Sequence, residues 1–414
     1  MSDKAYEAMK PYFSHDFFNP SAAYLPAKKV ASDYENAKAT IAHAIGAKAS
    51  DIVITAGATE ANNLAFTCVT EVLSQFGAFR SAAARELAPA ARGDGPDGRG
   101  PERDDTYVSA ADSNYSLAPA NVLYLVTEHD SVRKVAEQFG GQAIKVLANG
   151  LIDLDDLRQK ITDDTVLVSV SLANNELGTI QPMSEIATII KQIRFDRLKR
   201  GIKLPIYLHS DASQALNLLD ISVSRLGIDL LTMNSAKVYG PKGVGALYVA
   251  HGVRLRPLAY GGGQENGLRS GTENVPGVIG FATAIAESKE HLNGNRKKYA
   301  NWRKIILSEL TDYKLINKKH SLDNFVVVCY DGIDAERLVF LLEEQGVYVS
   351  TGAACAASKG VRSHVLAAIG LSDSEIAGSL RLTIGETNTE EQIHEAAKII
   401  NHVVEKEKQR IGNA

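Results

Sequence analysis

Cysteine and tryptophan are scarce in this sequence, and long apolar runs and an excess of charge of one sign are absent. The three cysteines among the 414 residues lie too far apart for the paired spacing of a structural zinc site or a disulfide framework. A formal net charge of −4 provides no basic footprint for nucleic acid. No apolar run approaches the ~18 residues of a membrane span, and the first residues do not resemble a signal peptide. We therefore predict a cytoplasmic protein with no metal site and no direct nucleic-acid or membrane partner.

The first part of the chain contains short apolar segments that alternate with stretches long enough for helices. These segments are rich in Val, Ile and Leu and show little alternation with polar residues, as in parallel strands covered on both faces. The pattern predicts an α/β fold with a mainly parallel central sheet flanked by helices. The predicted strands are Asp51–Thr55, Val122–Val126, Val166–Ser171, Ile206–His209, Asp229–Thr232 and Gly245–Val249.

The pattern changes after about residue 290. A charged helical stretch, Glu287–Leu310, precedes three short predicted strands and a final amphipathic helix. Thr389 and Gln392 have the spacing of a capping box at the start of that last helix. We predict a large domain over residues 1–293 and a smaller α+β domain over residues 294–414. Its predicted strands are Phe325–Tyr330, Val347–Ser350 and Leu380–Ile384.

Residues 86–105 interrupt this organisation. The segment has three prolines, four glycines and almost no apolar side chains, which is the composition of a disordered surface insertion. The alternative is a lid or an arm that docks a partner.

A turn of small residues lies between a predicted strand and a predicted helix within Thr55–Asn63. Backbone N–H groups at a helix start, with the hydroxyl of Thr59, form a cradle suited to phosphate. The alternative is an ordinary helix start without a ligand. The turn does not have the G-x-G-x-x-G spacing of dinucleotide sites, and Gly240–Gly245 lacks the Lys-Ser/Thr pair of a P-loop.

Asp211 and Lys237 each follow a predicted buried strand. A carboxylate at a strand end is costly unless it meets a cation, and ligands of α/β sheets bind at the carboxyl ends of the strands. A lysine there can form a Schiff base, and an aspartate can keep a pyridine nitrogen protonated. A solvated surface lysine is the alternative for Lys237 alone. Together the two residues favour pyridoxal phosphate as cofactor.

Eight short motifs follow one another along nearly the whole chain. They are Phe18–Ser21, Gly57–Asn63, Thr127–His129, Asn174–Gly178, Asp211–Gln214, Lys237–Gly243, Arg269–Asn274 and Ser350–Cys355. In this order they resemble the motifs of the cysteine desulfurase family, within the class-V aminotransferase-like enzymes. The resemblance implies a fold-type-I pyridoxal-phosphate-dependent transferase that converts L-cysteine to L-alanine.

The resemblance also implies roles for single residues. Lys237 would form the Schiff base and act as base on the substrate, Asp211 would pair with the pyridine nitrogen, and His129 would stack on the ring and assist proton transfer. Arg381 would bind the substrate carboxylate with both nitrogens. The remaining implied contacts are Ala58, Thr59 and Ser235 at the phosphate, Asn175 and Gln214 around the ring oxygen and the substrate, and Thr272 reaching the phosphate of the second subunit of a homodimer.

Cys355 would be the nucleophile that receives sulfur as a persulfide. It lies in a run of small residues that is typical of a mobile loop, and its thiol needs deprotonation to attack sulfur. The alternative is a small buried side chain. Cys68 and Cys329 are predicted to pack in a helix and a core strand. The acceptor of the persulfide sulfur would be a protein such as an iron–sulfur scaffold, a tRNA-thiolation enzyme or another carrier.

Three features depart from the family pattern. An initial strand that helps to line the active site is missing, Ala236 replaces a histidine that contacts the phosphate, and the 86–105 insertion is long. Loss of one hydrogen bond to a charged group costs roughly 1.5–3 kcal/mol. These departures leave open a catalytically impaired or partner-dependent scaffold, and a selenocysteine lyase is a third possibility.

Overall fold

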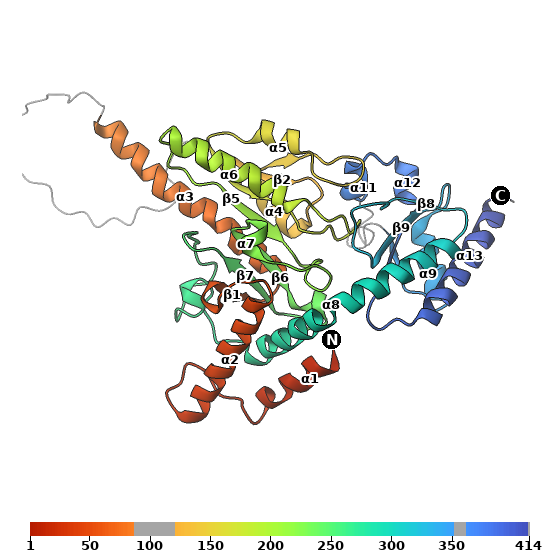
Figure 1. The fold of residues 1–414 in the computed structure, drawn as a ribbon, viewed down its shortest axis with the longest axis horizontal. Coiled ribbons are helices and arrows are strands. Elements are labelled where there is room, and N and C mark those ends of the chain that lie inside the picture. Colours follow the sequence, from red (N-terminus) through yellow and green to blue (C-terminus); the bar gives the residue numbers. More distant parts are fainter. Residues whose placement is uncertain (87–120, 352–361, 413–414) are drawn as a thin grey trace, which may run out of the picture.

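The computed structural model describes residues 1–86, 121–351 and 362–412, and these residues form two sheets with surrounding helices (Figure 1). The predicted insertion at residues 86–105 lies, apart from its first residue, outside the described residues. The larger sheet has seven strands in the order β1-β7-β6-β5-β4-β2-β3, and the smaller sheet has four in the order β10-β11-β9-β8.

The large sheet contains all six predicted strands and one that was not predicted. Only β7 runs antiparallel, to both β1 and β6, so the sheet is mainly parallel as predicted. The unpredicted strand β3 has three residues at the sheet edge, too few to form a periodic pattern. The strands are β1 (Ile52–Thr55), β2 (Asn121–Leu125), β3 (Gln142–Ile144), β4 (Thr165–Ser169), β5 (Tyr207–Asp211), β6 (Leu230–Asn234) and β7 (Gly245–Val249).

Alternate residues of these strands point to two separate cores. Ile52 and Ile54 join one core and Val53 the other, and Leu123 and Val122 divide in the same way. The first core includes apolar residues of α2, α6 and α8, and the second those of α3 and α4, so helices cover both faces. The helices of this part are α1 (Asp3–Met9), η1 (Lys10–Phe13), α2 (Leu25–His43), η2 (Ala49–Asp51), α3 (Ala58–Glu86), α4 (Asp130–Gln138), α5 (Leu154–Lys160), α6 (Met183–Lys199), α7 (Val223–Leu226), η3 (Ser235–Val238), η4 (Glu265–Gly267) and α8 (Val275–Glu309).

The smaller sheet is antiparallel throughout. The predicted strand Val347–Ser350 is wrong over most of its length, because the Val347 N–H bonds to the Leu342 carbonyl and so belongs to the end of α9. The capping box at Thr389 is confirmed, with reciprocal bonds to Gln392 of 3.1 and 3.3 Å. The elements are β8 (Lys314–Leu315), β9 (Phe325–Cys329), α9 (Ala335–Glu343), β10 (Ser350–Thr351), α11 (His364–Ala368), α12 (Asp373–Ala377), β11 (Ser379–Thr383) and α13 (Glu390–Gly412).

One helix, α8, joins the two sheets as a continuous rod of 35 residues (Figure 1). It packs against α1 and α2 on one side of the molecule and against α13 on the other. A Cβ at Gly280 would lie 2.4 Å from Met9 Sδ, so glycine permits the close approach of α1. The predicted domain boundary at residue 293 lies inside this helix. In the part of the chain that the structure describes, no helix combines the length and apolarity needed to cross a membrane.

Candidate active site

The carboxyl ends of β2, β4, β5 and β6 lie at one edge of the large sheet, because these four strands run parallel. Most of the predicted site residues follow one of these ends. Asp211 is the last residue of β5, and Lys237 lies in η3 directly after β6. His129 and Asn175 follow β2 and β4. The sheet therefore gathers residues that are up to about a hundred positions apart in the sequence.

A chain of hydrogen bonds joins Asp211 to His129. Asn62 Nδ2 donates to Asp211 Oδ2 at 2.9 Å and to Ser131 Oγ at 2.8 Å, and Ser131 Oγ lies 2.9 Å from His129 Nδ1. The other carboxylate oxygen of Asp211 accepts the Ser213 N–H at 2.9 Å. Asn62 and Ser131 were not predicted as site residues. Asn62 lies in the Gly57–Asn63 motif, but its partners Ser131 and Asp211 come from distant segments.

The position of His129 fixes which ring nitrogen carries a proton. Its Nδ1 accepts the backbone N–H of Ser131 at 3.1 Å and caps the start of α4. An imidazole nitrogen that accepts a hydrogen bond cannot carry a proton, so the neutral ring has its proton on Nε2. The ring is exposed, so Nε2 is accessible to a bound group.

The turn between β1 and α3 has the form expected of an anion cradle. Gly57 has φ 147°, a value that side chains rarely allow, and no described atom would lie within 4 Å of a Cβ there. The Ala61 N–H makes the first bond back to Gly57 O, so the N–H groups of Ala58 and Thr59 have no partner within the helix. Glu60 accepts the Ala56 N–H at 3.0 Å and a bond from Arg269 at 3.1 Å.

Arg269 fastens a second predicted site segment to this turn. It begins the motif that contains Thr272, which is exposed. Glu265, shortly before this segment, is also fixed in place. Its buried carboxylate accepts a hydrogen bond from the Lys38 ammonium at 3.0 Å and one from the Ile54 N–H at 2.8 Å.

Lys237 is exposed, in a turn whose backbone is tightly constrained. Tyr239 has φ 61°, in the left-handed region, and its hydroxyl accepts the Glu386 N–H at 2.9 Å. A Cβ at Gly240 would lie 2.2 Å from Ser235 Oγ, so only glycine fits beside this serine. Among the described residues, no hydrogen bond or ion pair holds the Lys237 ammonium. Its amine is thus positioned by the backbone and accessible to a carbonyl compound.

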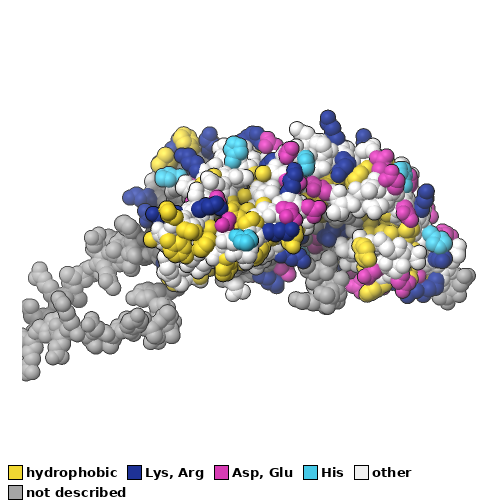
Figure 2. Space-filling model, turned by 90° about the horizontal axis from the view of Figure 1, so that it is seen from below, with side chains coloured by type: hydrophobic (Ala, Val, Ile, Leu, Met, Phe, Trp, Pro, Cys, Tyr) yellow, Lys and Arg dark blue, Asp and Glu magenta, His cyan; other side chains and the backbone are white. Residues whose placement is uncertain are grey.

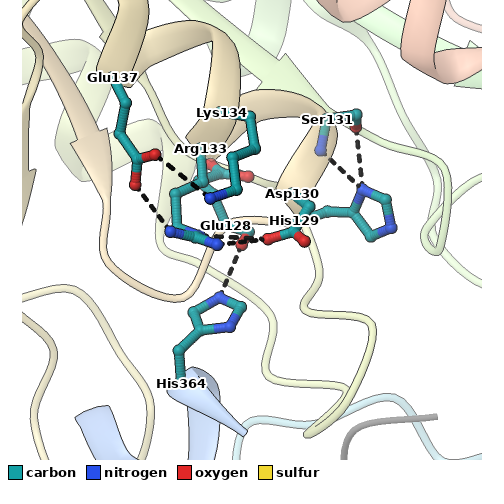
Figure 3. Close-up of polar contacts among 8 residues, drawn as sticks. All are labelled: Glu128, His129, Asp130, Ser131, Arg133, Lys134, Glu137 and His364. Atoms are coloured by element: carbon teal, nitrogen blue, oxygen red, sulfur yellow. Dashed lines mark hydrogen bonds and ion pairs between the residues drawn. The ribbon is translucent and has the colours of Figure 1, made fainter. Parts of the chain in front are cut away.

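Two buried glutamates flank the edge, and neither was predicted as a site residue. Burial and the nearby Asp211 raise the pKa of Glu128 to about 8, although its Oε1 accepts the Ser171 N–H at 2.5 Å. Burial raises the pKa of Glu176 to about 7, against the opposing effects of Ser363 and Arg381. In Figure 3, His364 points at the Glu128 carbonyl, to which its Nε2 donates at 3.0 Å.

Arg381, on β11 of the smaller sheet, reaches the same edge. Its Nη1 donates to the Asn175 carbonyl at 2.9 Å. Asn175 is half-buried in the loop after β4, and Gln214 is half-buried in the turn after β5. The site therefore lies between the two sheets, and the small sheet contributes a cation.

Cys355 lies outside the described residues. The flanks of its segment are described, and both reach the site. Ser350 pairs in register with Arg381, and Ser363 donates to Glu176 at 2.6 Å. Cys68 and Cys329 are buried in α3 and β9, which confirms the prediction that both pack in the core.

Several polar atoms at this edge are buried without a partner among the described residues. They are Asn62 Oδ1, Thr127 Oγ1, Ser213 Oγ and Ser235 Oγ. Buried polar atoms without partners are rare and need an explanation, such as a bound group. Pyridoxal phosphate fits the donor set, since it offers a phosphate for the Gly57 turn and Ser235 and a ring nitrogen for Asp211.

Comparisons with known proteins identify relatives along nearly the whole chain. The aminotransferase class-V family model matches residues 2–78 and 109–395. The chain is 34% identical to "Cysteine desulfurase IscS 1" of Archaeoglobus fulgidus, over 98% of this chain and 94% of that protein. It is 32% identical to "Cysteine desulfurase IscS" of Dictyoglomus turgidum, over 97% and 91%.

Solved structures give the same result. A NifS-like protein matches with a TM-score of 0.80 and 27% identity, covering 98% of this chain and 96% of that one. A structure described as SspA in complex with cysteine matches with a TM-score of 0.71 and 29% identity, over 93% and 95%.

Proposed function

The chain belongs to the cysteine desulfurases of the class-V aminotransferase family, and on this premise we propose how its own residues convert L-cysteine to L-alanine. The cofactor is proposed to be pyridoxal phosphate, which when bound withdraws electrons from the substrate α-carbon. The proposed holders are Lys237 at its carbonyl carbon, Asp211 at the ring nitrogen, Ala58, Thr59 and Ser235 at the phosphate, Asn175 and Gln214 around the ring oxygen, and Thr272 from the second subunit.

The single observation that carries this proposal is the environment of Asp211. Its buried carboxylate has two neutral donors, Asn62 and the Ser213 N–H, and no cation among the described residues. A buried carboxylate without a counter-charge is costly. A protonated pyridine nitrogen would supply that charge, and the bond from Asn62 holds the carboxylate in place to receive it.

The substrate amino acid is proposed to be oriented by Arg381 through its carboxylate. Lys237 would then move the α-proton, and His129, with its proton on Nε2, would stack on the ring and assist proton transfer. The Cys355 thiolate attacks the substrate sulfur, the bond between that sulfur and the β-carbon breaks, and a proton replaces sulfur on the β-carbon. The products are L-alanine and a persulfide on Cys355. The outer sulfur of this persulfide is proposed to pass to a sulfur-acceptor protein such as an iron–sulfur scaffold.

A homodimer is proposed as the working form. Large apolar side chains lie exposed around the connection between α1 and α2 and in the loop before η4, and Figure 2 shows such side chains gathered on the face seen from below. Grouped exposed side chains of this kind are typical of contact surfaces. The exposed large apolar side chains of these two segments include Phe13, Phe17, Tyr24, Leu25 and Tyr260. A cytoplasmic location is proposed from the composition.

Neither the described residues nor the comparisons favour the alternative of a catalytically impaired scaffold. The residue types that the chemistry needs are present, and Lys237, Asp211, His129 and Arg381 come to the same sheet edge. Ala236 is exposed, and the buried hydroxyl of the adjacent Ser235 offers a phosphate contact.

A direct assay tests the proposal. The purified protein, supplied with pyridoxal phosphate, is expected to develop a visible absorbance band and to release L-alanine from L-cysteine. The Cys355→Ser variant is expected to keep the band and lose sulfur transfer to a thiol acceptor, while Cys68→Ser retains both. Absence of alanine from the wild-type protein, with cofactor bound, would contradict the proposed function.

A further inference from the structure

The start of α11 is fastened to the large sheet at two points. Ser363, the N-cap of α11, donates to the buried carboxyl of Glu176 at 2.6 Å and accepts the Leu366 N–H at 3.1 Å. The next residue, His364, donates to the carbonyl of Glu128 at 3.0 Å (Figure 3). Both contacts cross from the smaller domain to the loops that follow β2 and β4.

Glu176 also follows directly on the residue that holds the guanidinium assigned to the substrate by the proposed function. Arg381 donates to the carbonyl of Asn175, which directly precedes Glu176, and the two opposite charges attract. Asn174 fixes this loop, because its side-chain oxygen accepts the N–H groups of Glu176 and Leu177 at 2.9 and 2.8 Å. These bonds fix the backbone of Glu176 beside the carbonyl that holds Arg381, and the bond from Ser363 holds its carboxyl.

We propose that Glu176 is a positioning residue that holds the N-terminus of α11 and, through its charge beside Arg381, sets how strongly Arg381 binds the carboxylate of the amino-acid substrate. The inference rests on the proposed function, since it takes Arg381 as the carboxylate-binding group. When Glu176 is neutral, it does not compete with a carboxylate for the positive charge of Arg381. When Glu176 is ionised, it competes with that carboxylate.

The groups that face Glu176 decide the pH at which this change occurs. Burial has the largest effect and raises its pKa to about 7, whereas the Ser363 hydroxyl and Arg381 lower it. Asp130, at the start of α4, raises it, but Asp130 is itself paired with Arg133 at 2.8 Å. Glu176 is therefore neutral below and ionised above about pH 7. Binding of a carboxylate at Arg381 favours the neutral form, so binding is coupled to proton uptake.

The Glu176→Gln variant removes this coupling while keeping the shape and an acceptor for Ser363. We expect the ratio of KM for L-cysteine, wild type over variant, to be near one at pH 6 and to rise up to about tenfold at pH 8.5, as for a pKa shift of one unit. Taking the ratio cancels the titration of the substrate itself. The exposed Glu343→Gln variant is the matched control and should give a flat ratio.

A second measurement avoids turnover altogether. Calorimetric titration of the holoenzyme with L-alanine, in two buffers of different ionisation enthalpy at pH 7, reports proton uptake. The wild type is expected to take up a fraction of a proton more than Glu176→Gln. Equal uptake together with a flat KM ratio would overturn the inference, even if the wild-type enzyme released alanine normally. Lack of alanine from L-cysteine would instead count against the proposed function, and the L-alanine titration would still test Glu176.

Ser363 supplies a test that leaves the glutamate in place. Its hydroxyl stabilises the ionised form, so Ser363→Ala should shift the rise in KM to higher pH, and Ser363→Thr should restore it. If Glu176 were only structural, these variants would lower the melting temperature and change KM by one factor at every pH. That outcome would also overturn the inference.

Discussion

One aspartate is largely buried near the amino ends of the parallel strands of the large sheet, and another near their carboxyl ends. These two aspartates have very different hydrogen-bond partners. Asp229, just before β6, forms an ion pair with Arg194 and accepts the Leu208 N–H at 2.7 Å. Asp211, at the carboxyl end of β5, accepts bonds from neutral groups alone among the described residues. The first carboxylate is satisfied by the fold, whereas the second has a place for a cation that the fold does not supply.

This contrast shows how a structural charge can be told from a functional one within a single sheet. Burial alone does not separate them, because both side chains are largely buried. The charge of the partner does separate the two aspartates. A buried carboxylate without a counter-charge lowers the stability of the folded protein. The same edge also holds the buried polar atoms without partners, such as Ser213 Oγ and Ser235 Oγ.

Lys237→Ala is expected to cause the largest loss of activity at the site formed by the carboxyl ends of the strands. Without its amine the protein has no group to bond covalently to the cofactor or to move the substrate proton. We expect turnover of L-cysteine to fall by about 10³-fold or more. Alanine release and the visible band are measured together, with the exposed Lys191→Ala as control. Normal turnover in Lys237→Ala would show that another residue has this role.

Asp211→Asn and Asp229→Asn test the comparison directly. Asp211→Asn keeps the shape and removes the charge, so turnover should fall by about 10²-fold or more while the melting temperature changes little. Asp229→Asn breaks an ion pair whose arginine is 39% exposed, so screening limits the loss of stability to about 1–3 kcal/mol. Its turnover per folded molecule should stay normal. The comparison fails if both variants lose mainly stability or both lose mainly turnover.

Ser235→Ala sharpens the comparison at one hydroxyl. Ser235 Oγ is buried without a partner among the described residues, so its loss should not lower the free energy of unfolding of the cofactor-free protein. A lost hydrogen bond to phosphate should weaken retention of pyridoxal phosphate by about tenfold to a hundredfold. Dialysis followed by absorbance measures retention. A loss of stability without a loss of retention would mean that the hydroxyl serves the fold.

Glu128→Gln is expected to have the smallest effect, on stability alone. Glu128 has a pKa of about 8 in the folded protein, above the ~4.3 of an unfolded chain. The folded state therefore holds its proton more tightly, so this stabilisation is full below about pH 4.3 and is lost as pH rises to about 8. The variant should melt near the wild type at pH 5 and a few degrees higher at pH 8.5. An unchanged difference between these two pH values would mean that Glu128 titrates normally.

The sequence was sufficient for the parts of the fold that depend on local patterns. The six apolar segments form strands, and β7 has the predicted bounds, because short runs of Val, Ile and Leu between helices are typical of buried strands. Strand β10 was misplaced because Val347 satisfies its N–H on the preceding helix, a choice that apolar composition does not reveal.

In the site, the residues at strand ends could be predicted from the sequence. The residues that hold them through hydrogen bonds could not. Asp211 and Lys237 follow strands, so the topology places them at the edge. Asn62, Glu176 and Ser363 depend on the approach of separate segments, and their bonds span up to 187 positions of sequence. Residue type alone does not distinguish the exposed His129 from the buried His209, whose pKa burial lowers to about 4, and only the motif resemblance selected His129.

The long helix α8 has a consequence for how the chain can fold during synthesis. At 35 residues it is about 52 Å long, and its partners α1 and α2 leave the ribosome before it, whereas α13 leaves last. Its first half can dock on a finished large sheet while its second half still lacks a partner. The helix can thus serve as a template, on which the later strands and α13 assemble in an orientation that is already set.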